Sequence, residues 1–548
     1  MERRKADFKK GVSQTDARRR RGETSVRIRK NKREEGLQKR RAMMTDVAPP
    51  PAADGVTPPP VPTTSTELRP VSSDIPRYAA ELDSSDPVVV RAAVRAFRRL
   101  LSAESKPPVL EVMEAGVLPK LCAFLGVIDD PELLFEAAWA LTNIASTDYT
   151  NVVVDGGAVE PLVELLMHYA PNVREQAAWC LGNVAGDSTR FRDFVLKHNA
   201  LQPLLVNIMN PASPSLLRNT TWALSNCCRG KPTPDLDAVS PAVAVLKGLL
   251  ETCQDPDVLM DACWALSYVS DGNDARIEAV VSSGVVPFLV RAVAMDNTKV
   301  VVPALRTLGN IVSGSDTQTQ AAIDSGVLQV APKLLTVWSQ KNILKETCWM
   351  LSNIAAGNKA QVAELCAVDG LAKIVIAHMD AAHVWDVRKE ACWVVANVGS
   401  SGSPKDVQLM VEEGAIYQLC QFLDFQDARL TQVVLDGLES MLRVGREVGE
   451  EEKFATLVDE AGGLDKLEGL QEHQDETIYN KAVNIIETYF NDADEVEDEN
   501  LAPAVQGNSF AFGLNQVPDA AAAPQGGKGL TFDFGVPSEV PAAPLFQF

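Results

Sequence analysis

A short motif built around tryptophan and asparagine recurs along this chain at an almost constant interval. Its pattern is two small residues, then Trp, any residue, usually Leu, any residue and Asn. Tryptophan leads the copies at Trp139, Trp179, Trp222, Trp264, Trp349 and Trp393, and degenerate copies begin at Arg95, Arg306 and Asp436. The intervals between successive copies are 44, 40, 43, 42, 42, 43, 44 and 43 residues. A period of about 40–47 residues is typical of helical repeats that stack into an elongated array.

A second recurring string, in which glycine precedes apolar residues, comes before many copies of the motif. Glycine suits a sharp turn between helices, and the apolar residues after it have the i, i+3, i+4 spacing that opens a helix. The copies are EAGVLPKL at 114–121, DGGAVEPL at 155–162, SSGVVPFL at 282–289, DSGVLQVA at 324–331 and EEGAIYQL at 412–419. Each unit therefore holds two or three helices, which is too few to bury a core alone. The sequence predicts an all-α fold, a right-handed superhelical solenoid of about ten armadillo repeats over residues 73–490.

Charge is spread very unevenly along the chain. Residues 1–44 contain 17 Lys/Arg and 6 Asp/Glu, a net charge of +11, whereas the whole chain carries −21. The other 504 residues therefore carry −32. A basic arm on an acidic body predicts a cationic ligand for the body or an acidic partner for the arm. Besides this arm at 1–44 we expect a flexible Pro-rich linker at 45–72 and a disordered tail at 491–548, acidic at first and then of low complexity.

The composition indicates which class of protein this is. A content of 46 % hydrophobic and 23 % charged residues is typical of a chain that folds. The N-terminus is Arg-rich without an apolar core, and no apolar run reaches 18 residues, so we expect neither a signal peptide nor a membrane span. The ten Cys residues form no CxxC pair and no metal-like spacing, which predicts buried free thiols in a reducing compartment. We therefore expect a cytosolic or nuclear protein without a metal or cofactor.

The paired Trp and Asn residues predict a binding face. Positions i and i+4 share one face of a helix, so stacking the repeats lines up the Trp and Asn residues in two rows. The Asn row offers donors and acceptors to the backbone of an extended peptide. The Trp row offers walls for the stems of Lys or Arg, whose heads are attracted to the indole faces. A single Trp at helical spacing is usually a core residue, but the repeated Asn on the same face favours a surface role.

Acidic and polar side chains accompany the two rows. Those that stand three residues before a tryptophan are Glu136, Gln176, Asn219, Glu346 and Glu390. Asp187, four residues beyond Asn183, adds a formal charge for a bound ammonium group. Because an exposed ion pair contributes only about 0–1 kcal/mol, affinity is expected to come from several repeats together.

Two residues interrupt the rows. Tyr268 stands where an Asn is expected and Arg306 where a Trp is expected. The intact pairs therefore form two groups, one from Trp139 to Asn226 and the other from Trp349 to Asn397. Arg306 is expected to repel a basic ligand between them. The sequence thus predicts two binding segments separated by a spacer.

Four stretches carry a resemblance to importin-α: WALTNIAS at 139–146, WCLGNVAGD at 179–187, WALSNCCRG at 222–230 and GNIVSGSDTQTQ at 309–320. The resemblance implies a nuclear protein import adaptor that binds mono- and bipartite nuclear localisation signals of cargo in two grooves. The implied major groove consists of Trp139, Asn143, Thr150, Gln176, Trp179, Asn183, Asp187, Asn219, Trp222 and Asn226. The implied minor groove consists of Arg306, Val312, Asp316, Thr319, Glu346, Trp349, Asn353, Glu390, Trp393 and Asn397.

The resemblance extends to segments outside the repeats. The residues similar to an importin-β-binding region are Arg18, Arg19, Arg20, Arg21, Arg27, Arg29, Lys30, Lys32 and Arg33. Lys39, Arg40 and Arg41 are similar to a localisation signal, which implies autoinhibition of the major groove that importin-β relieves. The acidic run at 492–499 lies where the family meets a recycling exportin with Ran-GTP, and the FAFG and FDFG motifs of the tail resemble nucleoporin repeats. Shuttling between cytoplasm and nucleus is implied.

Three other functions remain as alternatives. A catenin-like armadillo scaffold would share the fold but present basic grooves to acidic peptides. A nucleic-acid binder could place the arm on phosphates, although the acidic body argues against it. For an enzyme, the sequence contains no phosphate loop, HExxH or GxSxG motif. We therefore expect no catalytic residues and no direct binding of nucleic acid.

Overall fold

A computed structural model of the protein describes residues 71–102, 107–490, 504–506 and 509–511. Within them the chain is almost entirely helical. The predicted basic arm lies outside these residues, as do nearly all of the predicted linker and most of the predicted tail. The expectations about disorder in those segments therefore fall outside the described part of the chain.

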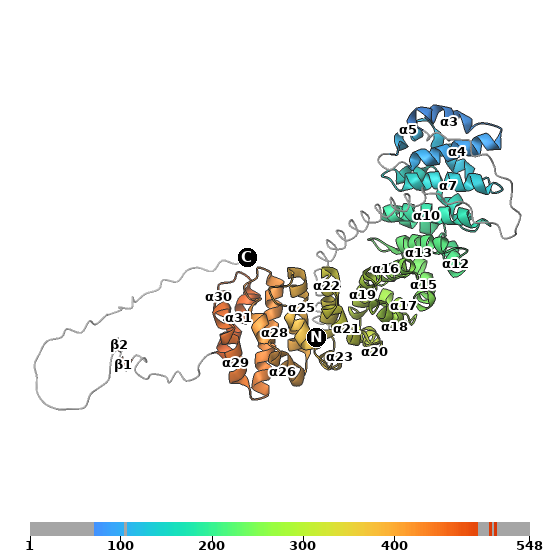
Figure 1. Ribbon diagram of the computed structural model, residues 1–548. Helices are drawn as coiled ribbons and strands as arrows, with labels where there is room; N and C mark the ends of the chain where they lie inside the picture. Colours follow the sequence, from blue (N-terminus) through green and yellow to red (C-terminus); the bar gives the residue numbers. More distant parts are fainter. Residues whose placement is uncertain (1–70, 103–106, 491–503, 507–508, 512–548) are drawn as a thin grey trace, which may run out of the picture. The chain divides into compact units, whose positions relative to one another are not determined.

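The motif lies on the longest helix of each repeat. The described residues contain ten such helices, and nine of them carry a full or degenerate copy of the motif. Their bounds are α4 (Pro87–Leu101), α7 (Pro131–Ala145), α10 (Pro171–Asp187), α13 (Pro214–Cys228), α16 (Pro256–Val269), α19 (Thr298–Val312), α22 (Lys341–Ala355), α25 (Trp385–Ser401), α28 (Ala428–Glu447) and α31 (Glu476–Tyr489). From α4 to α28, each of these helices packs on the next (Figure 1). The predicted helical solenoid of about ten repeats is confirmed.

Shorter helices precede the long ones, so that a typical repeat has three helices. The shorter elements are the 3₁₀ helix η1 (Ser72–Asp74) and the helices α3 (Ile75–Glu81), α5 (Val109–Glu114), α6 (Val117–Phe124), α8 (Thr150–Asp155), α9 (Val159–Leu165), α11 (Thr189–Lys197), α12 (Leu201–Met209), α14 (Leu236–Val239), α15 (Pro241–Thr252), α17 (Asp274–Val281), α18 (Val286–Val293), α20 (Asp316–Asp324), α21 (Val327–Thr336), α23 (Lys359–Cys366), α24 (Leu371–Ala377), α26 (Pro404–Glu412), α27 (Ala415–Cys420), α29 (Glu451–Glu460) and α30 (Gly463–Leu470). This agrees with the two or three helices expected of each unit.

Several long helices begin at a capping side chain followed by proline. The carboxylate of Asp130 accepts a hydrogen bond from the backbone N–H of Leu133 at 3.1 Å. The hydroxyl of Ser213 accepts one from the N–H of Leu216 at 3.0 Å. Such caps satisfy N–H groups that have no partner inside the helix, and proline at the first position lacks only an N–H that would be unpaired anyway. The start of these motif helices is therefore set by local sequence.

The glycine of the second recurring string forms the turn between the two short helices. Gly116 has a φ of 67° and Gly414 a φ of 93°, and the glycines of the other copies also lie in this left-handed region. Residues with a Cβ atom rarely adopt it. Between α11 and α12 the position is taken by Asn199, whose φ is 58°; it is the only non-glycine residue with positive φ among the described residues. The predicted turns are confirmed, and asparagine replaces glycine in one of them because it tolerates this conformation better than most residues.

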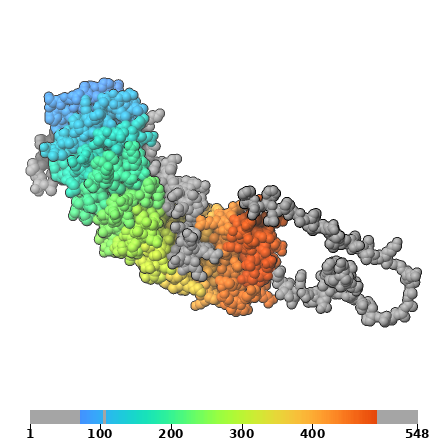
Figure 2. Space-filling model, turned by 180° about the vertical axis from the view of Figure 1, so that it is seen from behind, coloured from blue at the N-terminus to red at the C-terminus, as the bar shows by residue number. Residues whose placement is uncertain are grey.

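Apolar side chains from all three helices of a repeat meet in one continuous core. In one repeat, Leu141 of α7, Val153 of α8 and Leu162 of α9 are completely buried and belong to a common cluster. The colours in Figure 2 follow one another in sequence order, because each repeat packs on its neighbours in the chain. Among the described residues, no helix is both long and apolar enough to cross a membrane.

The cysteines are free thiols. Nine of the ten are buried, and Cys253 is half-buried. Burial raises the pKa of the Cys122 thiol to about 11 and that of Cys180 to about 12. A thiol that stays protonated is a poor nucleophile and a poor metal ligand. The prediction of buried free thiols is confirmed for all but Cys253.

The tail that was expected to lack regular structure contains a short hairpin. Strand β1 (Ala504–Gln506) pairs antiparallel with strand β2 (Ser509–Ala511). The all-α expectation is confirmed for the repeats, and the two strands lie beyond them. Three-residue strands are too short to give a clear alternating pattern, and an isolated hairpin is only marginally stable in water.

Candidate functional site

Every asparagine of the motif except Asn353 joins its helix to the long helix of the preceding repeat. Asn226 Nδ2 donates a hydrogen bond to the carbonyl oxygen of Gly182 at 2.9 Å, and Asn397 Nδ2 donates to that of Ser352 at 3.0 Å. Equivalent bonds run from Asn143 to Arg98 at 3.3 Å, from Asn183 to Thr142 at 3.1 Å and from Asn310 to Ser267 at 3.0 Å. A carbonyl oxygen can only accept, so these joints use the amide nitrogen and leave the amide oxygen for another partner.

The expectation that the Asn row offers both donors and acceptors on a surface is therefore wrong in part. Asn226 and Asn397 are each only 2 % exposed, and their donor groups are used inside the protein. The oxygens Asn226 Oδ1 and Asn397 Oδ1 are buried without a hydrogen-bond partner among the described residues. An unsatisfied buried acceptor costs about 1–3 kcal/mol. The two oxygens thus mark places where N–H groups of a ligand would be stabilising.

Buried polar atoms without a partner gather at the predicted site. They include Trp139 Nε1, Gln176 Oε1, Asn226 Oδ1, Asn353 Nδ2, Trp393 Nε1 and Asn397 Oδ1. Outside the predicted site, the described residues contain such atoms only in Arg174, Arg276 and Trp338. Buried polar groups of folded proteins almost always have partners, so each exception calls for an explanation. Their concentration at the motif indicates that this face is built to meet polar groups from outside the chain.

Two of the tryptophan rings lie close to the preceding helix because a glycine stands beneath them. A Cβ atom at Gly182 would lie 2.7 Å from Cε3 of Trp222, and one at Gly309 would lie 2.6 Å from Cε3 of Trp349. Both distances are too short for any side chain, so the rings occupy the space that glycine leaves. Four of the six motif tryptophans are half-buried, whereas Trp179 and Trp393 are buried. The half-buried rings keep an accessible part, as the predicted walls require.

The polar residues of the first group differ in how available they are. Asp187, the last residue of α10, is exposed, and its side chain has no hydrogen bond or ion pair within the described residues. Asn219 Nδ2 donates to Glu175 Oε1 at 2.9 Å. The hydroxyl of Thr150 is buried and donates to the carbonyl oxygen of Ala145 at 3.0 Å. Asp187 is therefore the carboxylate of this group that is ready to receive a cation.

An arginine of the protein already lies over the ring of the first motif tryptophan. The guanidinium carbon of Arg98 lies 4.3 Å from the ring centroid of Trp139. Arg98 Nε donates to Glu136 Oε2 at 2.7 Å, and Arg95 Nε donates to Glu136 Oε1 at 3.1 Å. Glu136 is 5 % exposed. The expectation that Glu136 would attract a ligand's cationic head is therefore wrong, because two arginines of the preceding helix already pair with it.

The second group begins with the same kind of cluster. Arg306 Nη2 donates to Glu346 Oε1 at 2.5 Å, and its guanidinium lies 5.6 Å from the ring centroid of Trp349. Lys345 Nζ lies 3.5 Å from the same carboxylate oxygen. Glu346 offsets part of the positive charge of this cluster, in which two cations share one carboxylate. The repulsion of a basic ligand by Arg306 stays a prediction. Because of these two contacts Glu346 is not an unpaired acid.

At the far end of the second group, buried residues meet an exposed arginine. Trp393 and Glu390 are each 2 % exposed. The guanidinium of Arg429, which belongs to α28, lies 5.7 Å from the ring centroid of Trp393. This tryptophan therefore contributes to the packing between α25 and α28 as well as to the predicted site.

Three further predicted residues lie at the junction of α19 and α20. Val312 and Thr319 are completely buried, and the Thr319 hydroxyl donates to the carbonyl oxygen of Val312 at 3.2 Å. Asp316 is half-buried and accepts a hydrogen bond from Asn358 Nδ2 at 3.4 Å. Of the three, Asp316 has the side chain that is within reach of a ligand.

Between the two groups, an aromatic pair replaces the Trp/Asn couple. The rings of Trp264 and Tyr268 are stacked with centroids 5.8 Å apart and an interplanar angle of 20°. Burial raises the pKa of the Tyr268 phenol to about 12. The interruption read from the sequence is thus a change in packing as well as in chemistry, since no amide oxygen is present at this position.

Known proteins match almost the whole chain. Matches to family models are the importin beta binding domain at 4–95, the armadillo/beta-catenin-like repeat at 105–146, 146–186, 188–229, 238–271 and 273–313, and the atypical Arm repeat at 452–504. Importin subunit alpha-2 of Arabidopsis thaliana is 44 % identical over 533 residues, covering 95 % of this chain and 96 % of the relative. The chain is a member of the importin-α family.

Other relatives agree with this assignment. Importin subunit alpha-1a of Oryza sativa subsp. japonica is 43 % identical over 522 residues, covering 94 % of this chain and 97 % of the relative. An engineered protein of known crystal structure is 27 % identical with a TM-score of 0.69, covering 76 % of this chain and 98 % of the engineered one. As an importin-α, the protein is a nuclear import adaptor that links cargo to importin-β, and it is not an enzyme. A catenin-like scaffold is not favoured.

Sequence reasoning missed several residues that shape the site of this importin-α. Gly182 and Gly309 lie beneath tryptophans of the following repeat, and Arg98 lies over Trp139. The hydroxyl of Ser102 accepts a hydrogen bond from Asn143 Nδ2 at 2.9 Å. A signal for the glycines was present, because both stand three residues after the leading position of their motif copy. Nothing local in the sequence indicates the positions of Arg98 and Ser102, whose partners lie about one repeat further along the chain.

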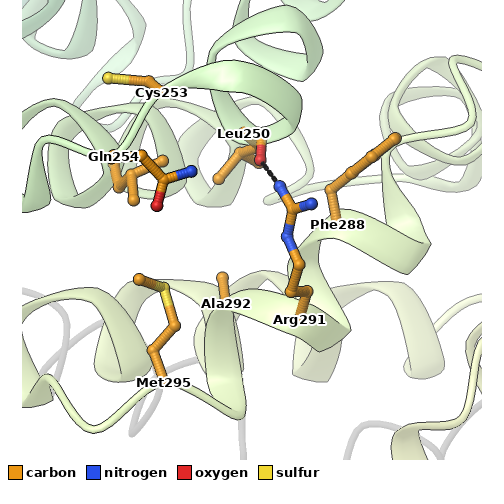
Figure 3. A pocket seen from close by; sticks show the side chains of 8 residues that line it. Leu250, Cys253, Gln254, Phe288, Arg291, Ala292 and Met295 are labelled. Carbon is orange, nitrogen blue, oxygen red and sulfur yellow. Dashed lines mark hydrogen bonds between the residues drawn. The ribbon is translucent and has the colours of Figure 1, made fainter.

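A cavity of about 230 Å³ lies between α15 and α18, apart from the motif residues. Figure 3 shows Arg291 reaching towards Leu250, whose carbonyl oxygen accepts a hydrogen bond from Arg291 Nη2. The same nitrogen donates to the carbonyl oxygen of Glu251 at 3.1 Å. The other lining residues are mostly apolar, and none belongs to the predicted site. Nor does the described part of the chain contain a group of His, Cys, Asp or Glu residues able to hold a metal ion.

Proposed function

We propose that Lys/Arg-rich localisation signals of cargo bind this importin-α along two segments of the motif face. The first segment consists of Trp139, Asn143, Gln176, Trp179, Asn183, Asp187, Asn219, Trp222 and Asn226. The second consists of Arg306, Asp316, Glu346, Trp349, Asn353, Glu390, Trp393 and Asn397. Thr150, Val312 and Thr319 are buried, and their part is to hold the backbone of these segments. The observation that carries the proposal is the set of unpartnered polar atoms that lies beside the tryptophans in both groups.

In the first segment, an extended peptide receives three kinds of contact. Its backbone N–H groups donate to amide oxygens such as Asn226 Oδ1. The aliphatic stems of its basic side chains lie against the half-buried ring of Trp222 and against the part of the Trp139 ring that Arg98 does not cover. One lysine head pairs with Asp187, which is exposed and has no other partner within the described residues. Each contact is weak alone, so affinity comes from several repeats acting together.

In the second segment, Asn397 Oδ1 accepts a backbone N–H of the peptide in the same way. Asn353 Nδ2 and the indole N–H of Trp393 are donors for its carbonyl oxygens. The charge is arranged differently, because Glu346 and Glu390 of this segment are buried and Asp316 is half-buried, whereas Asp187 of the first segment is exposed. A ligand here gains less from ion pairing and depends more on hydrogen bonds and on stem packing. A bipartite signal uses both segments, with its connecting stretch over the aromatic pair of Trp264 and Tyr268.

The N-terminal arm is the part that meets importin-β. This proposal is supported by the match of residues 4–95 to the importin beta binding domain and by the net charge of +11 over residues 1–44. The importin-β contacts fall to the basic residues from Arg18 to Arg33. Lys39, Arg40 and Arg41 occupy the protein's own first segment when importin-β is absent, because a tethered segment has an effective concentration of order mM. All these residues lie outside the described part of the chain.

The C-terminal part takes the roles that the family resemblance suggests. A recycling exportin with Ran-GTP meets the acidic run at 492–499, and nucleoporin contacts fall to the FAFG and FDFG motifs. Release and return through these partners make the protein shuttle between cytoplasm and nucleus. Truncation after residue 490 is expected to weaken exportin binding, which a pull-down with exportin and Ran-GTP measures.

The experiment that tests cargo binding is fluorescence anisotropy with a labelled Lys/Arg-rich signal peptide. The parent is the full chain with Lys39, Arg40 and Arg41 changed to Ala, so that the arm does not compete. Asp187→Lys reverses the exposed charge of the first segment and is expected to weaken binding by about 10- to 100-fold, equivalent to about 1.4–2.8 kcal/mol. The matched control is Asp129→Lys, which makes the same charge change at an exposed position outside the segment.

The outcomes separate the proposal from its alternatives. Loss of affinity in Asp187→Lys alone supports peptide binding in the first segment. Equal losses in the two variants mean that net charge, and not the segment, attracts the peptide. Absence of binding by the parent means that the motif face serves some other ligand.

A further inference from the structure

We propose that Arg98 is an end-stop of the first segment, a positioning residue that limits how many basic side chains of a ligand this segment accepts. The inference rests on the proposed function, because it concerns the ligand of the same site. Its basis is the cluster of Arg98, Glu136 and Trp139, which we call the first clasp.

In the first clasp, a cation of the protein takes the position that a ligand's basic head would take. The guanidinium carbon of Arg98 lies 4.3 Å from the centroid of Trp139. Cations are attracted to an indole face within about 6 Å of its centroid. A lysine or arginine of a ligand that approached this face would meet a like charge instead of the ring, and the two charges would repel.

Arg98 is held in this position from several directions. Its Nε donates to Glu136 Oε2 at 2.7 Å, and its side chain is only 16 % exposed. Its carbonyl oxygen accepts a hydrogen bond from Asn143 Nδ2 at 3.3 Å, which also ties the backbone at this residue to the next repeat. A charge-assisted hydrogen bond inside a half-buried cluster is stronger than one on an open surface. The clasp is therefore a built arrangement that a ligand does not easily displace.

Smaller residues take the corresponding position elsewhere in the first group, and beneath Trp222 it is glycine. The residue three positions after the leading residue is Arg98 in α4 but Gly182 in α10. A Cβ atom at Gly182 would already lie 2.7 Å from Cε3 of Trp222, so no arginine could lie there. Beneath Trp222 the close approach of the ring thus excludes an arginine at this position, whereas Arg98 covers the ring of Trp139.

The charges around the first clasp are matched within the protein. Three arginines of α4 pair with three acids, through Arg91 with Asp130 at 2.7 Å, Arg95 with Glu132, and Arg98 with Glu136 at 2.7 Å. No carboxylate in these pairs is left over for an additional lysine beyond Trp139. At the other side of the first group, Asp187 is exposed and has no partner within the described residues. A basic run is thus expected to extend from Trp139 towards Asp187 and to stop at the clasp.

The test compares peptides that differ by one lysine. Full-length protein, with Lys39, Arg40 and Arg41 changed to Ala, is titrated with a labelled four-residue basic core, with the core plus a Lys at its amino end, and with the core plus a Lys at its carboxyl end. In this parent protein, a Lys added at the end that meets the clasp is expected to change the Kd by less than about twofold. Arg98→Met keeps the aliphatic stem but removes the charge. In this variant the same added Lys is expected to increase the affinity by about three- to tenfold.

Matched variants distinguish positioning from a general structural effect. Arg99→Met removes the neighbouring exposed charge on the same helix and is expected to keep the parent's ratio of Kd values. Arg98→Lys restores a cation over the ring and is expected to do the same. Glu136→Gln loosens Arg98 without removing it, and a smaller gain of the same sign is expected. It provides the readout if Arg98→Met does not fold.

The ratio between peptides is insensitive to a loss of folded protein, because such a loss affects all peptides alike. An unchanged ratio in both Arg98→Met and Glu136→Gln, with tight binding of the core, overturns the end-stop and leaves the proposed function intact. Failure of the parent to bind any of the peptides overturns the proposed function itself. The end at which the extra Lys gains affinity also reveals the direction of the peptide along the segment.

Discussion

The two Trp/Asn groups share one plan of packing but differ in where their negative charge lies. Each group begins with an arginine over its first tryptophan, paired with a buried glutamate. The first group also has Asp187, which is exposed and without a partner within the described residues. In the second group, Glu346 and Glu390 are almost completely buried. Packing is repeated because each helix must fit its neighbour, whereas surface charge can change from repeat to repeat without affecting the fold.

Because the two groups pack alike, a methyl group added beneath a tryptophan is expected to lower stability equally in both groups. Gly182→Ala and Gly309→Ala each place a methyl group against a ring, at 2.7 Å from Trp222 Cε3 and 2.6 Å from Trp349 Cε3. Each substitution is expected to lower the free energy of unfolding by about 2–3 kcal/mol, because overpacking displaces the ring or the helix. Thermal and denaturant unfolding, followed by circular dichroism, measure the change.

The chain offers a matched control for these substitutions. Gly248 is a helical glycine with no atom within 4 Å of an added Cβ, so Gly248→Ala is expected to raise stability by about 0.5–1 kcal/mol through helix propensity. If either buried glycine behaves like Gly248, its tryptophan is not held in the way described, and the two groups do not share one plan.

The difference in charge predicts unequal responses to loss of a buried carboxylate. Glu136 accepts hydrogen bonds from two arginines, whereas Glu346 accepts one from Arg306 and has Lys345 at 3.5 Å. Glu136→Gln is expected to destabilise by about 2 kcal/mol and Glu346→Gln by about 1 kcal/mol, since the cations left behind are only partly shielded from water. Glu132→Gln, at a half-exposed carboxylate of the same helix as Glu136, serves as control and is expected to cost less than about 0.5 kcal/mol. Equal losses at all three positions would contradict the comparison.

The smallest expected effect concerns Tyr268 in the spacer between the groups, and it is a change in stability with pH. Burial raises the pKa of Tyr268 to about 12, so the folded protein keeps this proton at a pH where the unfolded chain, with a pKa of about 10, loses it. The contribution of Tyr268 to stability is therefore fully present below about pH 10 and is lost as pH rises towards 12. The midpoint of thermal unfolding is expected to fall more steeply over this range in the parent than in Tyr268→Phe.

A second tyrosine variant gives this measurement its control. The ring of Tyr417 is 56 % exposed, so Tyr417→Phe is expected to leave the steep fall of the parent unchanged. Should Tyr268→Phe follow the same curve as the parent, the phenol is not buried in the way described, and the spacer does not differ from its neighbours in this respect.

The repeat interval, the turns and the helix starts could be predicted from the sequence because their causes are local. A glycine such as Gly116 needs only its own backbone conformation, and a cap such as Asp130 acts on a residue three positions away. Asn199 was missed because only its φ reveals that it replaces glycine. The tail hairpin was missed because two strands of three residues leave almost no pattern.

The sequence predicts which positions form the site, but it does not predict which residues their side chains contact. Periodicity places Trp and Asn on one helix face, but it cannot tell which atoms of that face meet the preceding repeat. Asn226 and Gly182 are 44 residues apart, and Arg98 and Glu136 are 38 residues apart. Partners at such separations are fixed by stacking alone. The sequence analysis therefore left Glu136 and Arg306 as unpaired charges, although each has an opposite charge on the neighbouring helix.

The asparagine joints also have a mechanical consequence. Each joint fastens one long helix to the preceding repeat with only one or two hydrogen bonds, such as that of 3.0 Å from Asn397 to Ser352, so a stack of repeats can flex by small changes at every joint. A peptide bound across several joints would contact the helices on both sides of each joint and so restrict their relative motion. A loaded stack would then be stiffer than an empty one, and rigidity would accumulate with each repeat that the peptide spans.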